Sequence, residues 1–122
     1  MIIKKIRIFA HELNGEMDVY MDDDLFELYS TGKNRKYKEV ARNPELRSGF
    51  SRAVRTMMSV DSVNQLSSFS FLHYEHLKHQ LAGLSSVRLS NRYVHRLIFE
   101  EIDGGVVIRL IEINNTHYGN KK

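Results

Sequence analysis

Two kinds of hydrophobic periodicity divide the chain. Residues 2–9 and 15–21 alternate apolar and polar positions, and the second segment follows the turn signal "NG". Alternation over a short run is typical of a half-buried strand, so both segments predict strands. The second segment places three apolar side chains on one face: Met17, Val19 and Met21.

From Asp22 the apolar spacing changes to that of a helix. Apolar positions fall at i, i+3 and i+4: Leu25, Leu28 and Tyr29. The aspartates from Asp22 onward are N-cap candidates, and Gly32 is a stop signal. A second helix is predicted with Asn43 as its cap and Pro44 at its first position. It carries one apolar stripe: Leu46, Phe50, Ala53, Val54, Met57 and Met58. A short helical turn is expected near residues 62–67.

The remaining pattern is that of strands. In residues 85–90, Val87 and Leu89 point to one face. The other face carries Ser86, Arg88 and Ser90. "HRLIFEEI" then leads through Asp103-Gly104-Gly105, a strong hairpin signal, into "VVIRLIEI". The pattern predicts an α+β fold in which two N-terminal helices pack on one face of an antiparallel β-sheet. The opposite face is expected to be open and to carry Arg88.

Composition indicates one domain over residues 1–122. The chain is 42% hydrophobic and 27% charged, which suits a single small core. It contains no Cys, which excludes a disulfide framework, a thiolate metal site and a cysteine nucleophile. No signal peptide or transmembrane stretch is recognisable, so the expected location is cytoplasmic and no membrane partner is expected.

Charge is concentrated in one block. The net charge is only +3, but residues 33–55 hold eight cations and two anions, a local charge of +6. The cations are Lys33, Arg35, Lys36, Lys38, Arg42, Arg47, Arg52 and Arg55. The block favours a polyanionic or acidic partner, with a solvated helix face as an equally weighted alternative.

The stretch "HYEHLKH" at residues 73–79 raises the question of a metal site. Three-residue spacing drifts around a helix and alternates between the faces of a strand, so His73, His76 and His79 cannot share one tight face. HExxH is absent as well. No metal site is therefore expected in this stretch, and no cofactor is expected.

Four segments in order resemble the RelE/ParE superfamily of toxins from type II toxin–antitoxin pairs. "LYSTGKNRKYKEV" resembles HigB-like members, "YEHLKHQLAG" resembles the YoeB branch, and the last two, "GLSSVRLSNRYVHRLIF" and the "HY" near the chain end, resemble the superfamily's C-terminal half. The turn in "LSNRYVHRL" carries two extra residues. Residues 1–15 have no counterpart and are expected to add an edge strand.

The resemblance implies a ribosome-dependent mRNA endoribonuclease that inhibits translation. Cleavage by this class of enzyme needs no metal ion. The RNA 2′-hydroxyl attacks the neighbouring phosphorus, which calls for a base, an acid and cations. The implied catalytic residues are Glu75 as general base, Arg88 and Arg96 on the scissile phosphate, and His117 as general acid. Tyr118 is implied to orient the scissile phosphate or to stack on a nucleotide base. Each has a structural alternative: a solvated loop carboxylate for Glu75, an idle terminal residue for His117, packing on the sheet edge for Tyr118. For Arg96 it is a salt bridge to Glu100, Glu101 or Glu112.

Further residues are implied in binding. The residues expected to contact RNA or the ribosome are Lys33, Arg35, Lys36, Lys38 and Lys78. Tyr37 could stack on a base, although a buried anchor for its loop is the preferred interpretation. The implied partners are the ribosome, mRNA and a cognate antitoxin, with DNA contacted only through the antitoxin complex. Two alternatives are a ParE-like DNA gyrase inhibitor and a non-catalytic nucleic-acid-binding module.

Overall fold

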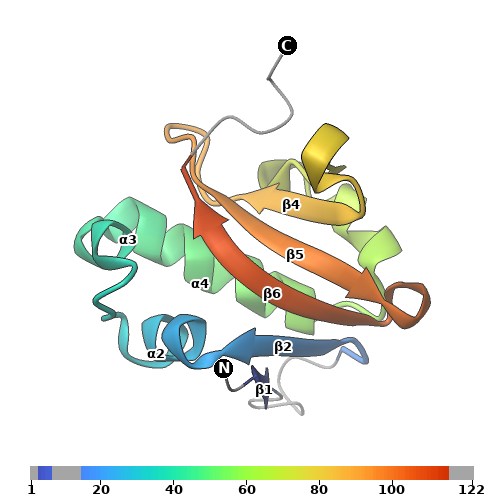
Figure 1. Ribbon diagram of the computed structural model, residues 1–122, viewed down its shortest axis with the longest axis horizontal. Coiled ribbons are helices and arrows are strands. Elements are labelled where there is room, and N and C mark those ends of the chain that lie inside the picture. The colour runs from blue at the N-terminus through green and yellow to red at the C-terminus, as the bar shows by residue number, and fades with distance from the viewer. Residues whose placement is uncertain (1–2, 7–14, 116–122) are drawn as a thin grey trace.

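The computed structural model of the protein describes residues 3–6 and 15–115 and shows a sheet with helices behind it (Figure 1). Within these residues the strands lie in the order β1-β2-β6-β5-β4-β3. Their bounds are Ile3–Ile6 (β1), Asp18–Asp22 (β2), Glu75–His76 (β3), Leu84–Arg88 (β4), Arg96–Ile102 (β5) and Val107–Asn114 (β6). The α+β class predicted from the sequence is confirmed.

The sheet is mixed, so the prediction of an antiparallel sheet is wrong in one place. β2 pairs with β6 in parallel, whereas the other neighbours pair antiparallel. Parallel neighbours require a long crossover, and the helices between β2 and the later strands provide it. The β4–β5–β6 meander is as predicted. Its last turn at Asp103–Gly105 has positive φ values of 58°, 72° and 89°, which suits the two glycines.

Local capping defines the helices. α2 spans Asp23–Thr31, with the Asp22 side chain accepting from the Leu25 amide and Gly32 in the left-handed conformation at its end. α4 spans Pro44–Met58, and the Asn43 side chain accepts from the first two free amides. Both N-terminal caps and the end of α2 at Gly32 are as predicted. A five-residue helix that the sequence pattern did not predict, α3 (Lys38–Arg42), lies between them.

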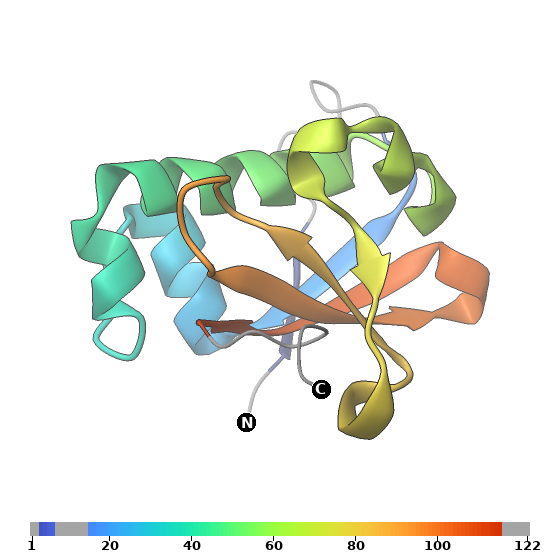
Figure 2. The same cartoon turned by 90° about the horizontal axis from the view of Figure 1, so that it is seen from above.

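The core lies between one face of the sheet and the helices. Figure 2 shows α2 and α4 on the same side of the sheet. The expected apolar faces of β2 and α4 are buried there, together with Val87, Leu97 and Phe99 of the meander. Gly49 permits the close contact of α4 with the chain after β4, because a Cβ at this position would lie 2.0 Å from the Leu89 carbonyl oxygen. The predicted turn near 62–67 is a 3₁₀ helix, η1 (Val63–Ser68), and a shorter one follows it, η2 (Ser70–Leu72).

Candidate functional site

Three of the expected catalytic residues lie together on the sheet face that α2 and α4 leave uncovered. Arg88 is directly opposite Arg96 in the β4–β5 register, and Glu75 is directly opposite Ser86. Because side chains alternate along a strand, Ser86 and Arg88 point to the same face, away from the core residue Val87. The segments carrying them are distant in sequence, so the sheet pairing is what assembles the cluster. We call Glu75, Ser86, Arg88 and Arg96 the arginine cluster.

The arginine cluster contains one tight ion pair. Arg96 Nη2 lies 3.1 Å from Glu75 Oε2, with 9% of the Arg96 side chain and 43% of the Glu75 side chain exposed. Burial lowers the pKa of Arg96 from its usual value; the Glu75 carboxylate opposes this effect and the nearby Arg88 cation adds to it. The partners considered for Arg96 from sequence were Glu100, Glu101 and Glu112, and none of these forms the pair.

The other arginine, Arg88, has no ion pair with a carboxylate among the described residues. Arg88 Nη1 reaches the Tyr93 carbonyl oxygen at 3.5 Å, near the limit for a hydrogen bond. Like charges directly opposite on neighbouring strands are destabilising, and the described ion pair of Glu75 is with Arg96. Three buried donor or acceptor atoms of the cluster lack a hydrogen-bond partner in the described chain: Ser86 Oγ, Arg88 Nε and Arg96 Nη1. Buried polar atoms are normally paired, so this arrangement suits an additional anion.

Two expected catalytic residues cannot be placed. His117 and Tyr118 lie outside the described residues. Asn114, the last residue of β6, is directly opposite Arg96. Lys78, expected to contact RNA or the ribosome, is exposed in the connection between β3 and β4, which contains the 3₁₀ helix η3 (His79–Leu81). It has no described contact with the arginine cluster.

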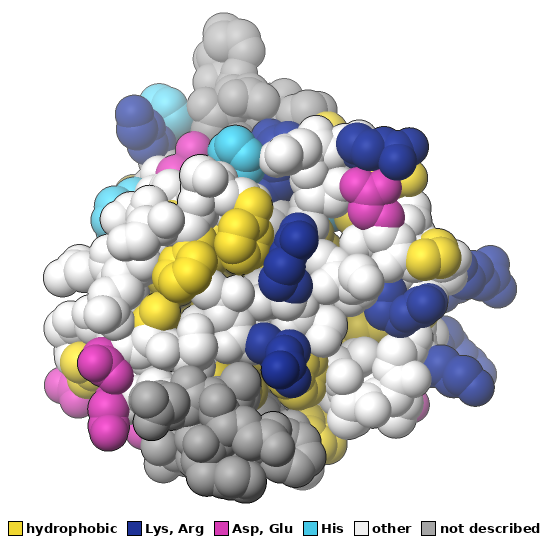
Figure 3. Space-filling view, turned by 180° about the vertical axis from the view of Figure 1, so that it is seen from behind, with side chains coloured by type: hydrophobic (Ala, Val, Ile, Leu, Met, Phe, Trp, Pro, Cys, Tyr) yellow, Lys and Arg dark blue, Asp and Glu magenta, His cyan; other side chains and the backbone are white. Residues whose placement is uncertain are grey.

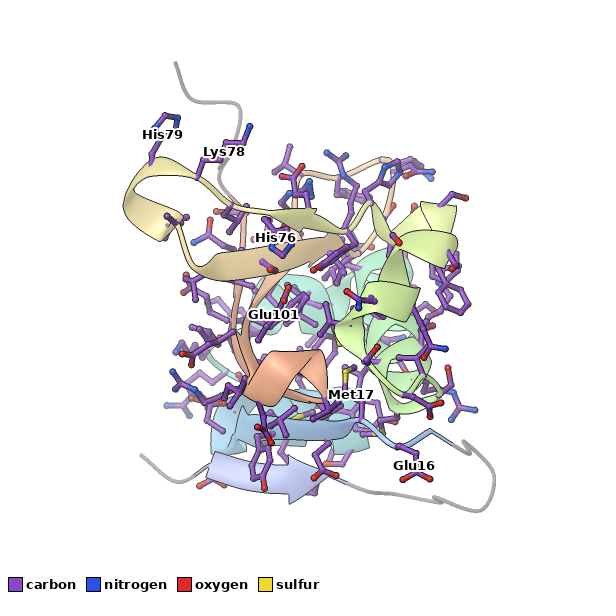
Figure 4. The ribbon with its side chains drawn as sticks, turned by 90° about the vertical axis from the view of Figure 1, so that its right-hand side faces the viewer. Glu16, Met17, His76, Lys78, His79 and Glu101 are labelled. Atoms are coloured by element: carbon purple, nitrogen blue, oxygen red, sulfur yellow. The ribbon has the colours of Figure 1, made fainter. Side chains whose placement is uncertain are left out.

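The three histidines of "HYEHLKH" have separate surroundings. His73 Nε2 lies 2.8 Å from Asn91 Oδ1, whereas His76 Nδ1 lies 3.1 Å from Ser85 Oγ. Figure 4 shows His79 at the far end of the β3–β4 connection, away from His76. Within the described residues, no group of three or more His, Cys, Asp or Glu side chains is arranged to hold a metal ion.

Within the described residues, the carboxylates of the basic block of residues 33–55 do not pair with its own cations. Its two carboxylates are directed to the β4–β5 connection: Glu45 Oε1 lies 3.0 Å from Arg92 Nη1, and Glu39 Oε1 lies 3.3 Å from His95 Nε2. None of the eight cations forms an ion pair with a carboxylate among the described residues. Figure 3 shows Lys and Arg side chains gathered along the edge where α3 lies. The block therefore presents a strong positive field.

Two cavities follow this basic edge. One, of about 570 Å³ between α2, α3 and α4, is lined by Thr31, Gly32, Lys33, Asn34, Lys38, Ala41, Arg42 and Arg47. The other, of about 550 Å³, is lined by Lys38, Glu39, Arg42, Asn43, Pro44 and Tyr93. They share Lys38 and Arg42, and the second reaches Tyr93, whose carbonyl oxygen contacts Arg88. Tyr93 thus connects the second cavity with the surroundings of Arg88.

Tyr37 anchors the basic loop and is not available to a nucleotide base. Its side chain is only 7% exposed and belongs to the core. Burial raises the pKa of Tyr37 to about 12, and the Asp22 carboxylate adds to the effect. The preferred interpretation from sequence is therefore confirmed. Lys33, Arg35, Lys36 and Lys38 around it are all exposed.

Several residues of the site had no role assigned from sequence. Ser86 was placed on the correct face by alternation, but its direct opposition to Glu75 depends on β3. Arg42 was predicted only as one cation of the basic block, and its place in the lining of both cavities was not predicted. Tyr93 carried no pattern at all, because it lies in the irregular β4–β5 connection.

None of the helices in residues 3–6 and 15–115 is long and apolar enough to cross a lipid bilayer. Comparison of the chain with protein-family models finds no match, and comparison with curated proteins finds no significant match.

Proposed function

We propose that this protein is the toxin of a type II toxin–antitoxin system, with a RelE/ParE-like fold, and that it cleaves mRNA on the ribosome. The observation that carries the proposal is the arginine cluster: two opposed guanidinium groups with unpaired donor atoms beside one carboxylate. A phosphodiester supplies the missing negative charge. The planar guanidinium fork also matches two phosphate oxygens.

In this proposal the phosphate exchanges for Glu75 on Arg96. Arg88 and Arg96 hold the scissile phosphate and stabilise the charge that develops on its oxygens. The released Glu75 carboxylate accepts the 2′-hydroxyl proton while the 2′ oxygen attacks phosphorus and the bond to the 5′ oxygen breaks. A proton must be delivered to that leaving oxygen. His117 is the proposed donor and Tyr118 its neighbour at the phosphate; both follow Asn114 closely in sequence.

The basic block would hold the RNA backbone. Lys33, Arg35, Lys36 and Lys38 contribute positive charge independent of base sequence, and the two cavities add Arg42 and Arg47. The same uncompensated charge would attract an acidic antitoxin segment that folds on binding. A cytoplasmic location, where ribosomes and the antitoxin occur, belongs to this proposal.

A cell-free translation reaction with primer extension tests the proposed activity. We expect cuts within codons of the translated mRNA, and we expect Arg88→Ala and Glu75→Gln to lower the cleavage rate by roughly 10²-fold or more. Arg109→Ala is the matched control, because Arg109 is also a sheet arginine paired with a glutamate, Glu100, at 2.7 Å. Blocked DNA supercoiling by gyrase without mRNA cuts would support the ParE-like alternative instead. RNA binding without any product would support a non-catalytic module.

The role of the basic block is tested separately by RNA binding. The double variant Lys38→Gln/Arg42→Gln removes two cations of α3 that line both cavities. The control Arg52→Gln/Arg55→Gln removes two cations of α4 that line neither of these cavities. Binding of a short 2′-O-methylated single strand is measured over a salt series. We expect the first variant to reduce the salt slope by about 1.4, from ~0.7 per lost phosphate contact. Equal slopes in both variants would contradict a defined RNA path.

A further inference from the structure

A second polar cluster lies on the core-facing side of the same three strands. Tyr74 Oη and Ser85 Oγ both donate to Glu101 Oε2, at 2.5 Å and 2.6 Å. His76 Nδ1 lies 3.1 Å from Ser85 Oγ and 3.6 Å from Glu101 Oε2. Figure 4 shows His76 next to Glu101. We call these four residues the Glu101 cluster; unlike the arginine cluster, its side-chain oxygens are hydrogen-bonded to one another.

The Glu101 cluster holds the residues on either side of Glu75. Tyr74 precedes Glu75 and His76 follows it, and because strand side chains alternate, both point away from the arginine cluster. The Tyr74 ring also stacks on Phe99 of the core, with a centroid distance of 6.2 Å and an angle of 22°. The backbone around Glu75 is thus attached to β4 and β5 from the side opposite its own carboxylate.

The backbone pairing of β3 is short, and Leu77, which follows it, is buried. β3 is a two-residue strand at the edge of the sheet, with the register pairs Glu75↔Ser86 and His76↔Ser85. One more backbone hydrogen bond continues the pairing, from the Leu77 amide to the Leu84 carbonyl oxygen at 2.8 Å. So short a strand is marginal on backbone pairing alone. Its side-chain contacts therefore decide where Glu75 lies.

We propose that Glu101 is a positioning residue, which holds Glu75 beside Arg96 through Tyr74 and the Ser85–His76 contacts. We call the attachment of Tyr74 and His76 to Glu101 and Ser85 the clamp. The inference rests on the proposed function for its catalytic consequence, but the clamp itself is a structural property of β3 and its neighbours. Displacement of a base by about 1 Å can lower a rate by about 10². A carboxylate on the core side of the sheet would thus control the geometry of one on the other side.

Amide hydrogen exchange tests the clamp without reference to activity. Glu101→Ala removes the shared acceptor, and Glu100→Ala removes the adjacent glutamate, which points to the other face and pairs with Arg109. We expect the Leu77 amide to lose protection about tenfold or more in Glu101→Ala, while amides of β5 and β6 change little. Unchanged protection at Leu77, or equal loss in both variants, would overturn the clamp. If Glu101→Ala does not fold, Tyr74→Phe removes one hydroxyl and keeps the ring.

The cleavage assay tests the consequence for Glu75. We expect Glu101→Ala to lower the maximal rate on the order of tenfold with an unchanged half-saturating ribosome concentration. Glu101→Gln, which can still accept from both hydroxyls, should retain most of the rate. In a Glu75→Gln background, Glu101→Ala should have no further effect, whereas independent losses that multiply would overturn the positioning role. Absence of cleavage by the wild-type protein would contradict the proposed function and leave the exchange result to judge the clamp.

Discussion

The two polar clusters are built from the same strands and differ in how completely their polar atoms are paired. On the core side, Glu101 accepts from two hydroxyl groups and lies beside His76. On the other side, Glu75 pairs with Arg96, and Arg96 and the opposed Arg88 each have a donor atom without a hydrogen-bond partner in the described chain. A paired network stabilises a fold, whereas buried unpaired donors cost stability unless a ligand uses them. The comparison separates a cluster whose polar atoms are paired with one another from the cluster to which we assign phosphate binding in the proposed function.

The largest expected effect is the response of activity to Arg88→Ala. Loss of one preorganised cation at a developing charge should lower the cleavage rate by roughly 10²–10³. The free energy of unfolding should stay the same or rise slightly, because the variant relieves repulsion between opposed cations. The cell-free cleavage assay and urea unfolding measure the two quantities. A loss of more than ~1 kcal/mol of stability would mean that Arg88 is a structural residue.

The opposite response is expected on the core side. Glu101→Ala leaves the Tyr74 and Ser85 hydroxyl groups, both part-buried, without their acceptor. The cost should be about 2–3 kcal/mol of unfolding free energy, since each hydrogen bond to a charged group contributes roughly 1.5–3 kcal/mol and water partly compensates. Urea unfolding of Glu101→Ala against Glu100→Ala measures it. Equal stabilities would remove the distinction between the two faces.

Much of the frame that holds both clusters was predictable from local pattern. Asp22, Gly32 and Asn43 act through their immediate neighbours, so their caps are readable from sequence. β3 was not predictable, because two residues carry no periodicity and their pairing depends on β4. The parallel contact of β2 with β6 and the Glu75–Arg96 pair join distant segments. Neither leaves a local signal.

A smaller effect is expected from Glu75→Gln, which leaves the buried Arg96 without its carboxylate. Breaking a fully buried pair costs about 3–5 kcal/mol, but Glu75 is 43% exposed, so we expect about 1–2 kcal/mol. Addition of Arg88→Gln should restore part of this loss, by a few tenths to about 1 kcal/mol, because it removes the opposed cation. Urea unfolding of the two single variants and the double variant closes the cycle. A double variant no more stable than Glu75→Gln would show that Arg88 and Arg96 do not repel each other.

The smallest expected effect concerns alkaline pH and Tyr74. Burial raises the pKa of Tyr74 above its usual value, and the hydrogen bond to the Glu101 carboxylate raises it further. A pKa raised in the folded state gives stability that is complete below the unfolded value of about 10 and is lost as the pH climbs toward the folded value. Tyr74→Phe should cost roughly 1 kcal/mol at neutral pH, the value of one hydrogen bond. The stability difference between Tyr74→Phe and the wild type should shrink above about pH 10. At that pH the hydroxyl ionises in the unfolded wild type, which favours unfolding of the wild type only. Urea unfolding at pH 7 and at pH 10.5 measures the difference, and a gap that stays constant between the two would show that the Tyr74 proton is not held by Glu101.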